Sequence, residues 1–113
     1  MIRPGEIYVA DFEEMQPHPV VVVSREELNR GNWVAAVLIT SQRFEERSKQ
    51  PHCVPFRARE FGLSTDCVAQ CESLFSIWPE ELGDHLGTLD VERWRSLVRA
   101  LGNMMGSDCQ PVI

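Results

Sequence analysis

Residues 33–42 read WVAAVLITSQ and contain the longest apolar run of the chain, seven residues that end just before Thr40. An uninterrupted apolar run of this length is typical of a strand that is buried on both faces. We therefore expect a central strand here, followed at once by the polar side chains of Thr40, Ser41 and Gln42. The end of this strand is the first candidate for a functional site.

Four further segments are rich in β-branched and apolar residues and predict strands. They are residues 6–12, 20–23, 53–57 and 66–74. The second consists of four consecutive valines, which again indicates burial on both faces. In the last, alternation places Cys67, Ala69 and Cys71 on one face.

The segments between these strands predict turns and one short helix. Ser24 and Glu27 have the spacing of a capping box, which predicts a helical turn that ends near residue 30. Residues 43–51 are charged and without periodicity, and we expect a mobile, solvated loop. Residues 59–62 predict a turn, and residues 78–82 a turn or a helical start.

A longer helix is expected after Asp90, which is a suitable N-cap. Its apolar residues fall on one stripe, and we expect them to cover the barrel: Val91, Trp94, Leu97, Val98 and Leu101. A glycine, Gly102 or Gly106, ends the helix, and the tail from residue 107 is expected to be frayed. The predicted fold is α+β but mainly β, a small barrel closed by a C-terminal helix, with residues 1–113 as one domain.

The composition indicates an ordinary globular protein. The chain has 43% hydrophobic and 25% charged residues, as in ordinary globular proteins, and no apolar run approaches the roughly 20 residues of a membrane helix. There is no signal-peptide pattern, so we expect a soluble, cytoplasmic protein without membrane partners. The net charge of −6 argues against broad binding to duplex nucleic acid and leaves room for a local groove or for a basic protein segment.

The four cysteines do not form a paired short-spacing motif, and only three histidines accompany them. We therefore expect neither a metal site nor any other cofactor. Cys67 and Cys71 lie about 13 Å apart along a strand, which is too far for a disulfide. Buried free thiols are the expected state.

Five stretches, in this order and spacing, resemble the MazF/PemK family of type II toxin-antitoxin ribonucleases along nearly the whole chain. They are residues 4–12 (PGEIYVADF), 19–24 (PVVVVS), 28–30 (LNR), 39–42 (ITSQ) and 88–90 (TLD). The resemblance implies an SH3-like half-open β-barrel that forms homodimers and cleaves single-stranded RNA, such as mRNA, without a metal. It also implies a cognate antitoxin, a peptide or protein that occupies the same groove.

The resemblance places the family's catalytic threonine on Thr40, whose hydroxyl would contact the scissile phosphate. The family's catalytic arginine falls on His18. Histidine is charged only near or below about pH 6.5, so His18 would serve as a general base on the ribose 2′-hydroxyl. A solvated turn histidine, and a threonine that bonds only its neighbouring backbone, are the plainer alternatives.

Two further family features are altered. A Gln-x-Arg-Thr stretch falls on residues 73–76, which removes another arginine, and the loop between the first two strands is shortened to residues 13–17 and is acidic. The expected substrate contacts are Gln42, Ser41, Ser73 and Phe75. Phe75 and Trp78 would stack on unpaired bases, with core packing as the alternative for these aromatics.

Three functions are therefore consistent with the sequence. The first is a sequence-specific endoribonuclease toxin with an altered site that contains Thr40 and His18. The second is a catalytically inactive protein of the same fold that binds an antitoxin or inhibits a protein target, as gyrase-type toxins do. The third is a structural module without a ligand.

Overall fold

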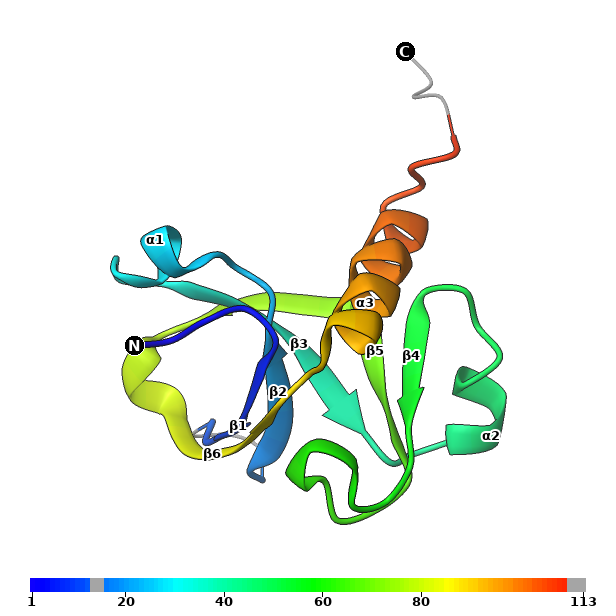
Figure 1. Cartoon of the computed structure of the whole chain (residues 1–113), viewed down its shortest axis with the longest axis horizontal. Coiled ribbons are helices and arrows are strands. Elements are labelled where there is room, and N and C mark those ends of the chain that lie inside the picture. Colours follow the sequence, from blue (N-terminus) through cyan, green and yellow to red (C-terminus); the bar gives the residue numbers. More distant parts are fainter. Residues whose placement is uncertain (13–15, 110–113) are drawn as a thin grey trace.

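The computed structural model describes residues 1–12 and 16–109, and within them one antiparallel sheet has the strand order β4-β5-β3-β2-β1-β6 (Figure 1). Its strands are β1 Glu6–Ala10, β2 His18–Val22, β3 Val34–Thr40, β4 Cys53–Phe56, β5 Cys67–Ile77 and β6 Leu82–Thr88. The helices are α1 Glu26–Asn29, α2 Phe44–Arg47 and α3 Val91–Met104, with 3₁₀ turns η1 Glu60–Gly62 and η2 Pro79–Glu81.

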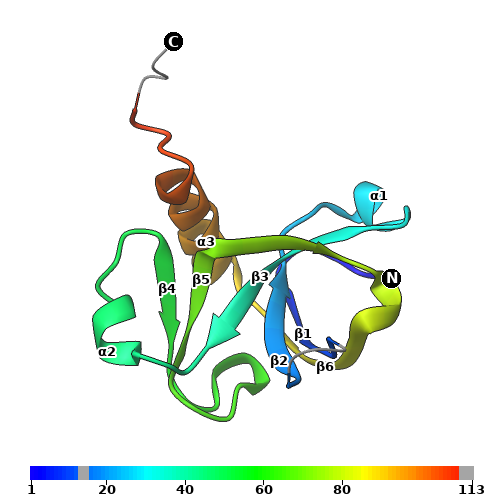
Figure 2. The same ribbon diagram turned by 180° about the vertical axis from the view of Figure 1, so that it is seen from behind.

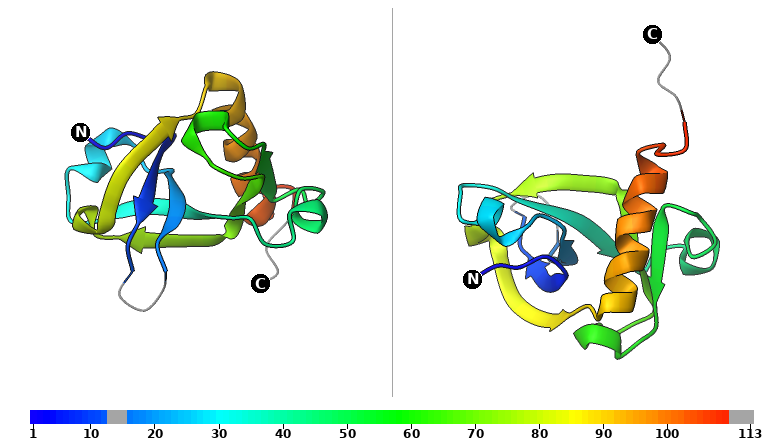
Figure 3. Two further views of the ribbon diagram at one scale, coloured as in Figure 1. Left: turned by 90° about the horizontal axis from the view of Figure 1, so that it is seen from below. Right: turned by 45° about the horizontal axis from the view of Figure 1, so that its top comes forward.

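The sheet curls into a half-open barrel, and α3 packs on it through contacts with β4 and β5 (Figure 3). This arrangement confirms the predicted fold class. Within the described residues, none of the helices is both long and apolar enough to span a bilayer. The predicted acidic loop lies partly at residues 13–15, and the predicted tail partly at residues 110–113, outside the described residues.

The predicted two-sided burial of the central strands is confirmed. In β2, Val21 packs into one core cluster, while Val20 and Val22 pack into a second cluster on the other face. β3 divides in the same way, with Val37 in the first cluster and Ala36 in the second. All five side chains are fully buried, because each face of these strands packs into one of the two core clusters.

The open seam of the barrel is sealed where η1 meets β6. Gly62 has a φ of +80°, and a Cβ there would lie 2.0 Å from the carbonyl oxygen of Leu86. A Cβ on Gly87 would likewise lie 2.3 Å from the carbonyl oxygen of Phe61. The two backbones can approach this closely only because both positions lack a side chain.

The C-terminal helix begins as predicted and packs differently from the prediction. The Asp90 carboxylate accepts a hydrogen bond from Arg93 N at 2.8 Å, which confirms the N-cap. Leu97 and Ala100 are buried against the core, with Trp94 and Leu101 partly buried beside them. Val91 and Val98, placed on the buried stripe by the sequence pattern, are 65% and 50% exposed, because the helix turns its Leu97–Ala100 side to the sheet.

Two local predictions were wrong, and one strand was not predicted. Ser24 does not cap α1, which has no side-chain cap; its hydroxyl donates to the Asn29 side chain and accepts a bond from Ala35 N at 3.0 Å. Residues 43–51 are not a plain loop, because they contain α2, where Arg47 donates to the Gln42 carbonyl at 3.2 Å. The strand β6 was not expected.

Candidate functional site

The ends of β2 and β3 separate and leave a hollow between them. The last paired residues of the two strands are Val20 and Leu38, although β2 begins at His18 and β3 continues to Thr40. Figure 2 shows the two strands diverging toward these ends. The space between these strand ends is a hollow of about 180 Å³. It is lined by His18, Pro19, Ile39, Thr40, Ser41, Gln42, Leu63, Ser64, Thr65 and Cys67.

Thr40 lies at the inner wall of this hollow and is only 7% exposed. Its Oγ1 accepts a hydrogen bond from Gln42 N at 3.2 Å, so the turn after β3 folds back onto the hydroxyl. A hydroxyl that accepts one bond still has its proton to donate. The local backbone role expected as the plain alternative is thus present, and it orients the Thr40 hydroxyl while leaving that donor available.

His18, half-buried at the first residue of β2, lies on the wall that faces β3. Its backbone is paired with Ala10 of β1, which holds this strand end in the sheet. The structure therefore places His18 and Thr40 in one hollow. Ser41 and Gln42, exposed in the turn after Thr40, complete that side.

The remaining wall comes from the segment between η1 and β5. Ser64 and Thr65 present exposed hydroxyl groups at the rim, and Leu63 and Cys67 are buried beneath them. Sequence reasoning missed the two hydroxyl residues. Their position in a Ser-Thr-Asp triplet just before an apolar strand, like Thr40-Ser41-Gln42 just after one, was the available signal.

Ser73, Phe75 and Trp78 do not line the hollow. Ser73 accepts a hydrogen bond from Gln70 Nε2 at 2.9 Å, near a register shift in the β3–β5 pairing. Phe75 packs edge-on against Phe12 in the second core cluster, with ring centroids 5.4 Å apart. Trp78 packs against another tryptophan beyond the opposite end of β3. A role in RNA contact for these residues therefore stays a prediction separate from the Thr40 site.

Trp33 packs against Trp78, with ring centroids 4.1 Å apart, ring planes tilted by 39° and both side chains nearly half exposed. Because Val34, the first residue of β3, pairs with Ile77, these two rings lie at the start of the strand and Thr40 at its end. The strand rises about 3.3 Å per residue, so roughly 20 Å separates the tryptophans from Thr40.

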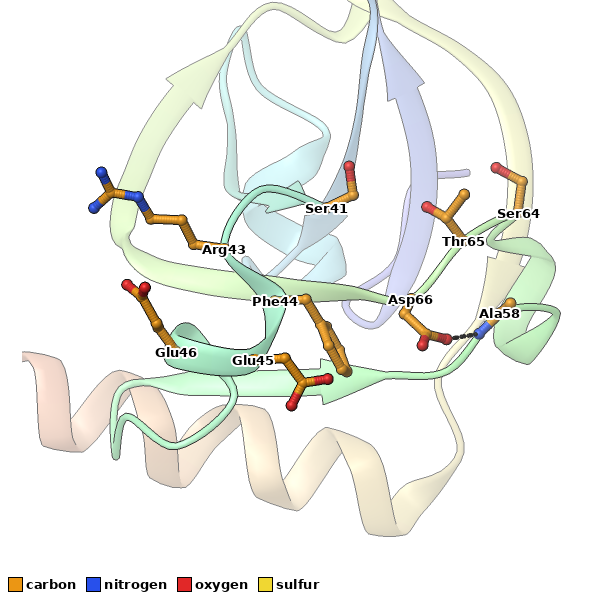
Figure 4. A pocket seen from close by; sticks show the side chains of 9 residues that line it. All are labelled: Ser41, Arg43, Phe44, Glu45, Glu46, Ala58, Ser64, Thr65 and Asp66. Carbon is orange, nitrogen blue, oxygen red and sulfur yellow. Dashed lines mark hydrogen bonds between the residues drawn. The ribbon is translucent and has the colours of Figure 1, made fainter.

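A second, more open hollow adjoins the first and shares Ser41, Ser64 and Thr65 with it (Figure 4). The view shows Arg43 on the opposite side from Ser64 and Thr65. The charged residues of its lining are one arginine and three carboxylates: Arg43, Glu45, Glu46 and Asp66. Arg43 has a φ of +53°, which is uncommon for a residue with a Cβ.

The polar groups that line the two hollows are mainly hydroxyl groups and carboxylates. Asp66 accepts a bond from Ala58 N at 2.8 Å, and this bond, with Arg57 beside it, lowers the pKa of its carboxyl. Within residues 1–12 and 16–109, no arginine or lysine lines the Thr40 hollow. His18 is therefore the one described side chain of that lining that can carry a positive charge.

Comparison with known proteins gives a consistent result. Residues 3–105 match the family model described as PemK-like, MazF-like toxin of type II toxin-antitoxin system. A mycobacterial endoribonuclease solved in complex with its cognate antitoxin is similar, with a TM-score of 0.80, 25% identity, and coverage of 98% of this chain and 100% of that one. No curated protein matches the sequence.

Two further solved structures share the fold. The Mycobacterium tuberculosis toxin MazF-mt6 has a TM-score of 0.76 and 24% identity, over 88% of this chain and 95% of that one. The MazE-MazF structure from Deinococcus radiodurans has a TM-score of 0.72 and 18% identity, over 93% and 95%. The match of residues 3–105 to the family model confirms the family resemblance that the sequence motifs indicated, and these two structures show the same fold.

Proposed function

The chain belongs to the PemK-like, MazF-like toxin family of type II toxin-antitoxin systems, and from that membership we propose that it is a toxin that cleaves single-stranded messenger RNA. The cleavage is sequence-specific and independent of a metal ion, as in the family that the chain resembles. The observation that carries the proposal is the placement of Thr40 and His18 in one hollow, with the Thr40 hydroxyl held by Gln42 N.

The hollow suits a phosphodiester in size and polarity. Its volume of about 180 Å³ accommodates one sugar-phosphate unit, and hydroxyl groups of Thr40, Ser41, Ser64 and Thr65 belong to its lining. Hydroxyl donors stabilise the extra negative charge that a phosphoryl oxygen acquires in the transition state. The buried Leu63 and Cys67 below exclude water from that side, which strengthens each of these hydrogen bonds.

In this scheme His18 accepts the proton of the ribose 2′-hydroxyl. The 2′-oxygen forms a bond to the adjacent phosphorus, and the bond from phosphorus to the 5′-oxygen of the next nucleotide breaks. The leaving oxygen takes a proton from water. The products are a 2′,3′-cyclic phosphate and a free 5′-hydroxyl, and the proton on His18 returns to solvent.

We also propose that the protein works as a cytoplasmic homodimer that a cognate antitoxin neutralises. Support for a dimer comes from α3, where exposed apolar residues recur every seven positions, at Val91, Val98 and Met105. Support for an antitoxin comes from family membership and from the similar mycobacterial endoribonuclease, which was solved with its own antitoxin.

The experiment is an incubation of the purified chain with a mixed-sequence single-stranded RNA in the presence of a chelator, followed by sequencing of the new ends. We expect cuts at one short motif. Thr40→Val keeps the shape and removes the hydroxyl, so it should lower the rate about 10²–10³-fold, whereas Thr40→Ser should retain most activity. Thr88→Val, at the end of β6 and outside the hollow, is the matched control.

A second candidate function is binding without cleavage. The adjoining hollow carries Glu45, Glu46 and Asp66, and three carboxylates repel a polyanion. A protein of this kind would bind an antitoxin or inhibit a protein target. Intact RNA across a broad pH range, together with tight binding of the antitoxin, would favour this second function over the ribonuclease.

A further inference from the structure

A cluster of three different metal-binding side chains lies at the start of β4, away from the Thr40 hollow. His52 immediately precedes this strand, Cys53 is its first residue, and Glu72 belongs to β5. Figure 1 shows β4 and β5 side by side. The ligand atoms of the three side chains all lie within 4.8 Å of one another. His52 Nε2 and Glu72 Oε2 are 3.1 Å apart.

The backbone holds this cluster in place. Cys53 pairs with Gln70 across the β4–β5 ladder, and directly paired residues project to the same face of a sheet. Glu72 is two residues beyond Gln70 and therefore shares that face. The carbonyl oxygen of His52 accepts a hydrogen bond from Cys71 N at 3.2 Å, which fixes the third residue beside the other two.

We propose that His52, Cys53 and Glu72 bind a thiophilic divalent cation of the zinc class, with three protein ligands and one open position. Imidazole, thiolate and carboxylate are the ligand types that Zn²⁺ takes, at about 2.0–2.3 Å, so neighbouring ligand atoms stand roughly 3.5 Å apart. His52 Nε2 and Glu72 Oε2 are already within this spacing, and the other separations, at most 4.8 Å, exceed it by about 1.3 Å or less, a movement within the rotamer freedom of the exposed Glu72 and half-buried His52.

The charges also balance. A thiolate and a carboxylate neutralise a divalent ion, so the guanidinium of Arg47, which lies close enough to influence the thiol, faces a site without net charge. In the metal-free protein, burial and the Glu72 carboxylate outweigh Arg47 and raise the pKa of the Cys53 thiol. Metal binding therefore displaces a proton from Cys53.

Binding would act on the segment that leads away from the candidate site. Residues 41–52 run from the turn beside Thr40, through α2, to His52. Arg47 of α2 donates to the carbonyl oxygen of Gln42, which ties the helix to that turn. An ion held by His52, Cys53 and Glu72 would fasten the far end of the segment to β5, a role independent of RNA cleavage.

The test is a titration of the full-length, reduced protein with Co²⁺, followed by displacement with Zn²⁺. We expect one equivalent of Co²⁺ to give the sulfur-to-cobalt charge-transfer absorption of a thiolate ligand, and Zn²⁺ to abolish it. Thermal unfolding with Zn²⁺ at a hundred times its Kd should show a rise in Tm of about 10 °C.

Two variants identify the ligands. Cys53→Ser should remove the absorption, and Glu72→Gln should weaken Co²⁺ binding at least tenfold; the second change is on an exposed side chain and leaves the fold intact, as circular dichroism can verify. His85→Ala is the matched control, because His85 also lies near a carboxylate, 3.7 Å from Glu6, but without a cysteine. Cys109→Ser is the control for the exposed thiol.

The proposal is overturned if Co²⁺ produces no thiolate absorption, if Glu72→Gln binds as tightly as the unchanged protein, or if Cys109→Ser removes the signal. Loss of the signal in Cys53→Ser and weaker binding in Glu72→Gln, with both controls unaffected, establish the site. The cobalt titration does not measure RNA cleavage. If the protein does not cleave RNA, the metal proposal therefore still stands.

Discussion

The Thr40 hydroxyl accepts a hydrogen bond from Gln42 N, and that bond belongs to the turn after β3. Among the described residues, the hydroxyl proton of Thr40 has no recorded hydrogen-bond acceptor, so it is available to a ligand that has oxygen acceptors. The backbone of His18 is fixed by its pairing with Ala10. Its side chain is half-buried at the end of a strand.

His18→Arg restores the residue that the family resemblance expects at this position. Arginine carries a permanent charge and a planar fork that matches phosphate, but it cannot accept the proton of the 2′-hydroxyl, so we expect the variant to bind RNA and to cleave it more slowly than the unchanged chain at pH 8. His18→Ala should lower the cleavage rate about 10²–10⁴-fold, because it removes the proposed general base from the lining of the hollow. Rates from a labelled RNA containing the mapped cut site provide the measurement.

The control for this pair is His85→Arg, at a histidine in β6 outside the hollow, which should leave the rate unchanged. A chain in which His18→Ala cleaves as fast as the original would contradict a role for His18. In that case the histidine is a solvated residue at the strand end, the plainer alternative.

The four cysteines should differ sharply in reactivity. Burial raises the pKa of the Cys67 thiol to about 11 and that of Cys71 to about 12, and it also raises the pKa of Cys53. Cys109 is exposed. Since the thiolate is the nucleophile, we expect a thiol reagent at pH 8 to modify one cysteine of four rapidly, and all four after denaturation. Rapid modification of Cys71 in the native protein, seen by mass spectrometry, would contradict the buried core.

At the scale of elements, η1 and α3 are joined by an ion pair at the barrel seam. Arg93 Nη1 lies 2.9 Å from Glu60 Oε2, and the guanidinium also lies over the rings of Phe56 and Phe61. The bond from Arg93 is the main cause of the lowered pKa of the Glu60 carboxyl. Both side chains are about one-third exposed, so solvent screens much of the attraction.

Glu60→Gln should therefore lower the free energy of unfolding by about 0.5–1 kcal/mol at pH 7. Because the folded pKa of Glu60 is lowered, its contribution is present above the unfolded pKa and is lost as the pH falls through the folded value. The difference between the two chains should thus shrink as the pH falls below the ordinary glutamate pKa of about 4.3. Urea unfolding at pH 7 and at a series of lower pH values measures it, with Glu27→Gln, in an exposed pair 4.0 Å from Arg25, as a control that changes little.

The elements that the sequence predicted are those whose pattern reflects burial. The valines of β2 and the apolar run of β3 are hydrophobic at consecutive positions because both faces of these strands are covered, and this is visible without a structure. β6 is different: it reads LGDHLGT, and it is a strand because β1 offers it a backbone edge, with two register shifts in the pairing. Such tertiary pairing leaves no hydrophobic pattern in the sequence.

The candidate site was predictable in part for the same reason. Thr40 and its turn stand next to the apolar strand that drew attention to them, and the family resemblance added His18. Ser64 and Thr65 reach the hollow only because η1 is held against β6 by the close approach at Gly62 and Gly87. That contact joins distant parts of the chain, and no local pattern encodes it.

Considering the whole molecule, the net charge of −6 fits a protein that contacts few phosphates and meets a basic partner segment. Within the described residues, α3 and its C-cap residue Met105 also carry an apolar stripe that is largely exposed. Val91, Val98 and Met105 are 65%, 50% and 73% exposed, and the partly buried Trp94 and Leu101 lie between them in the a and d spacing of a helix seam. A stripe of this kind is suited to a second copy of α3.

If α3 forms the homodimer interface, a charge in the middle of the stripe must weaken the dimer. Val98→Glu places two carboxylates in the interface without partners, so we expect the dimer dissociation constant to rise at least a hundredfold, or about 2.7 kcal/mol. Sedimentation velocity over a range of concentrations measures it, and circular dichroism should show an unchanged fold, since Val98 is half exposed in the single chain. Arg99→Glu, on the next position of α3 and off the stripe, is the control and should remain dimeric. An unchanged chain that sediments as a monomer at every concentration would contradict the dimer itself, and a dimer that survives Val98→Glu would place the interface on another surface.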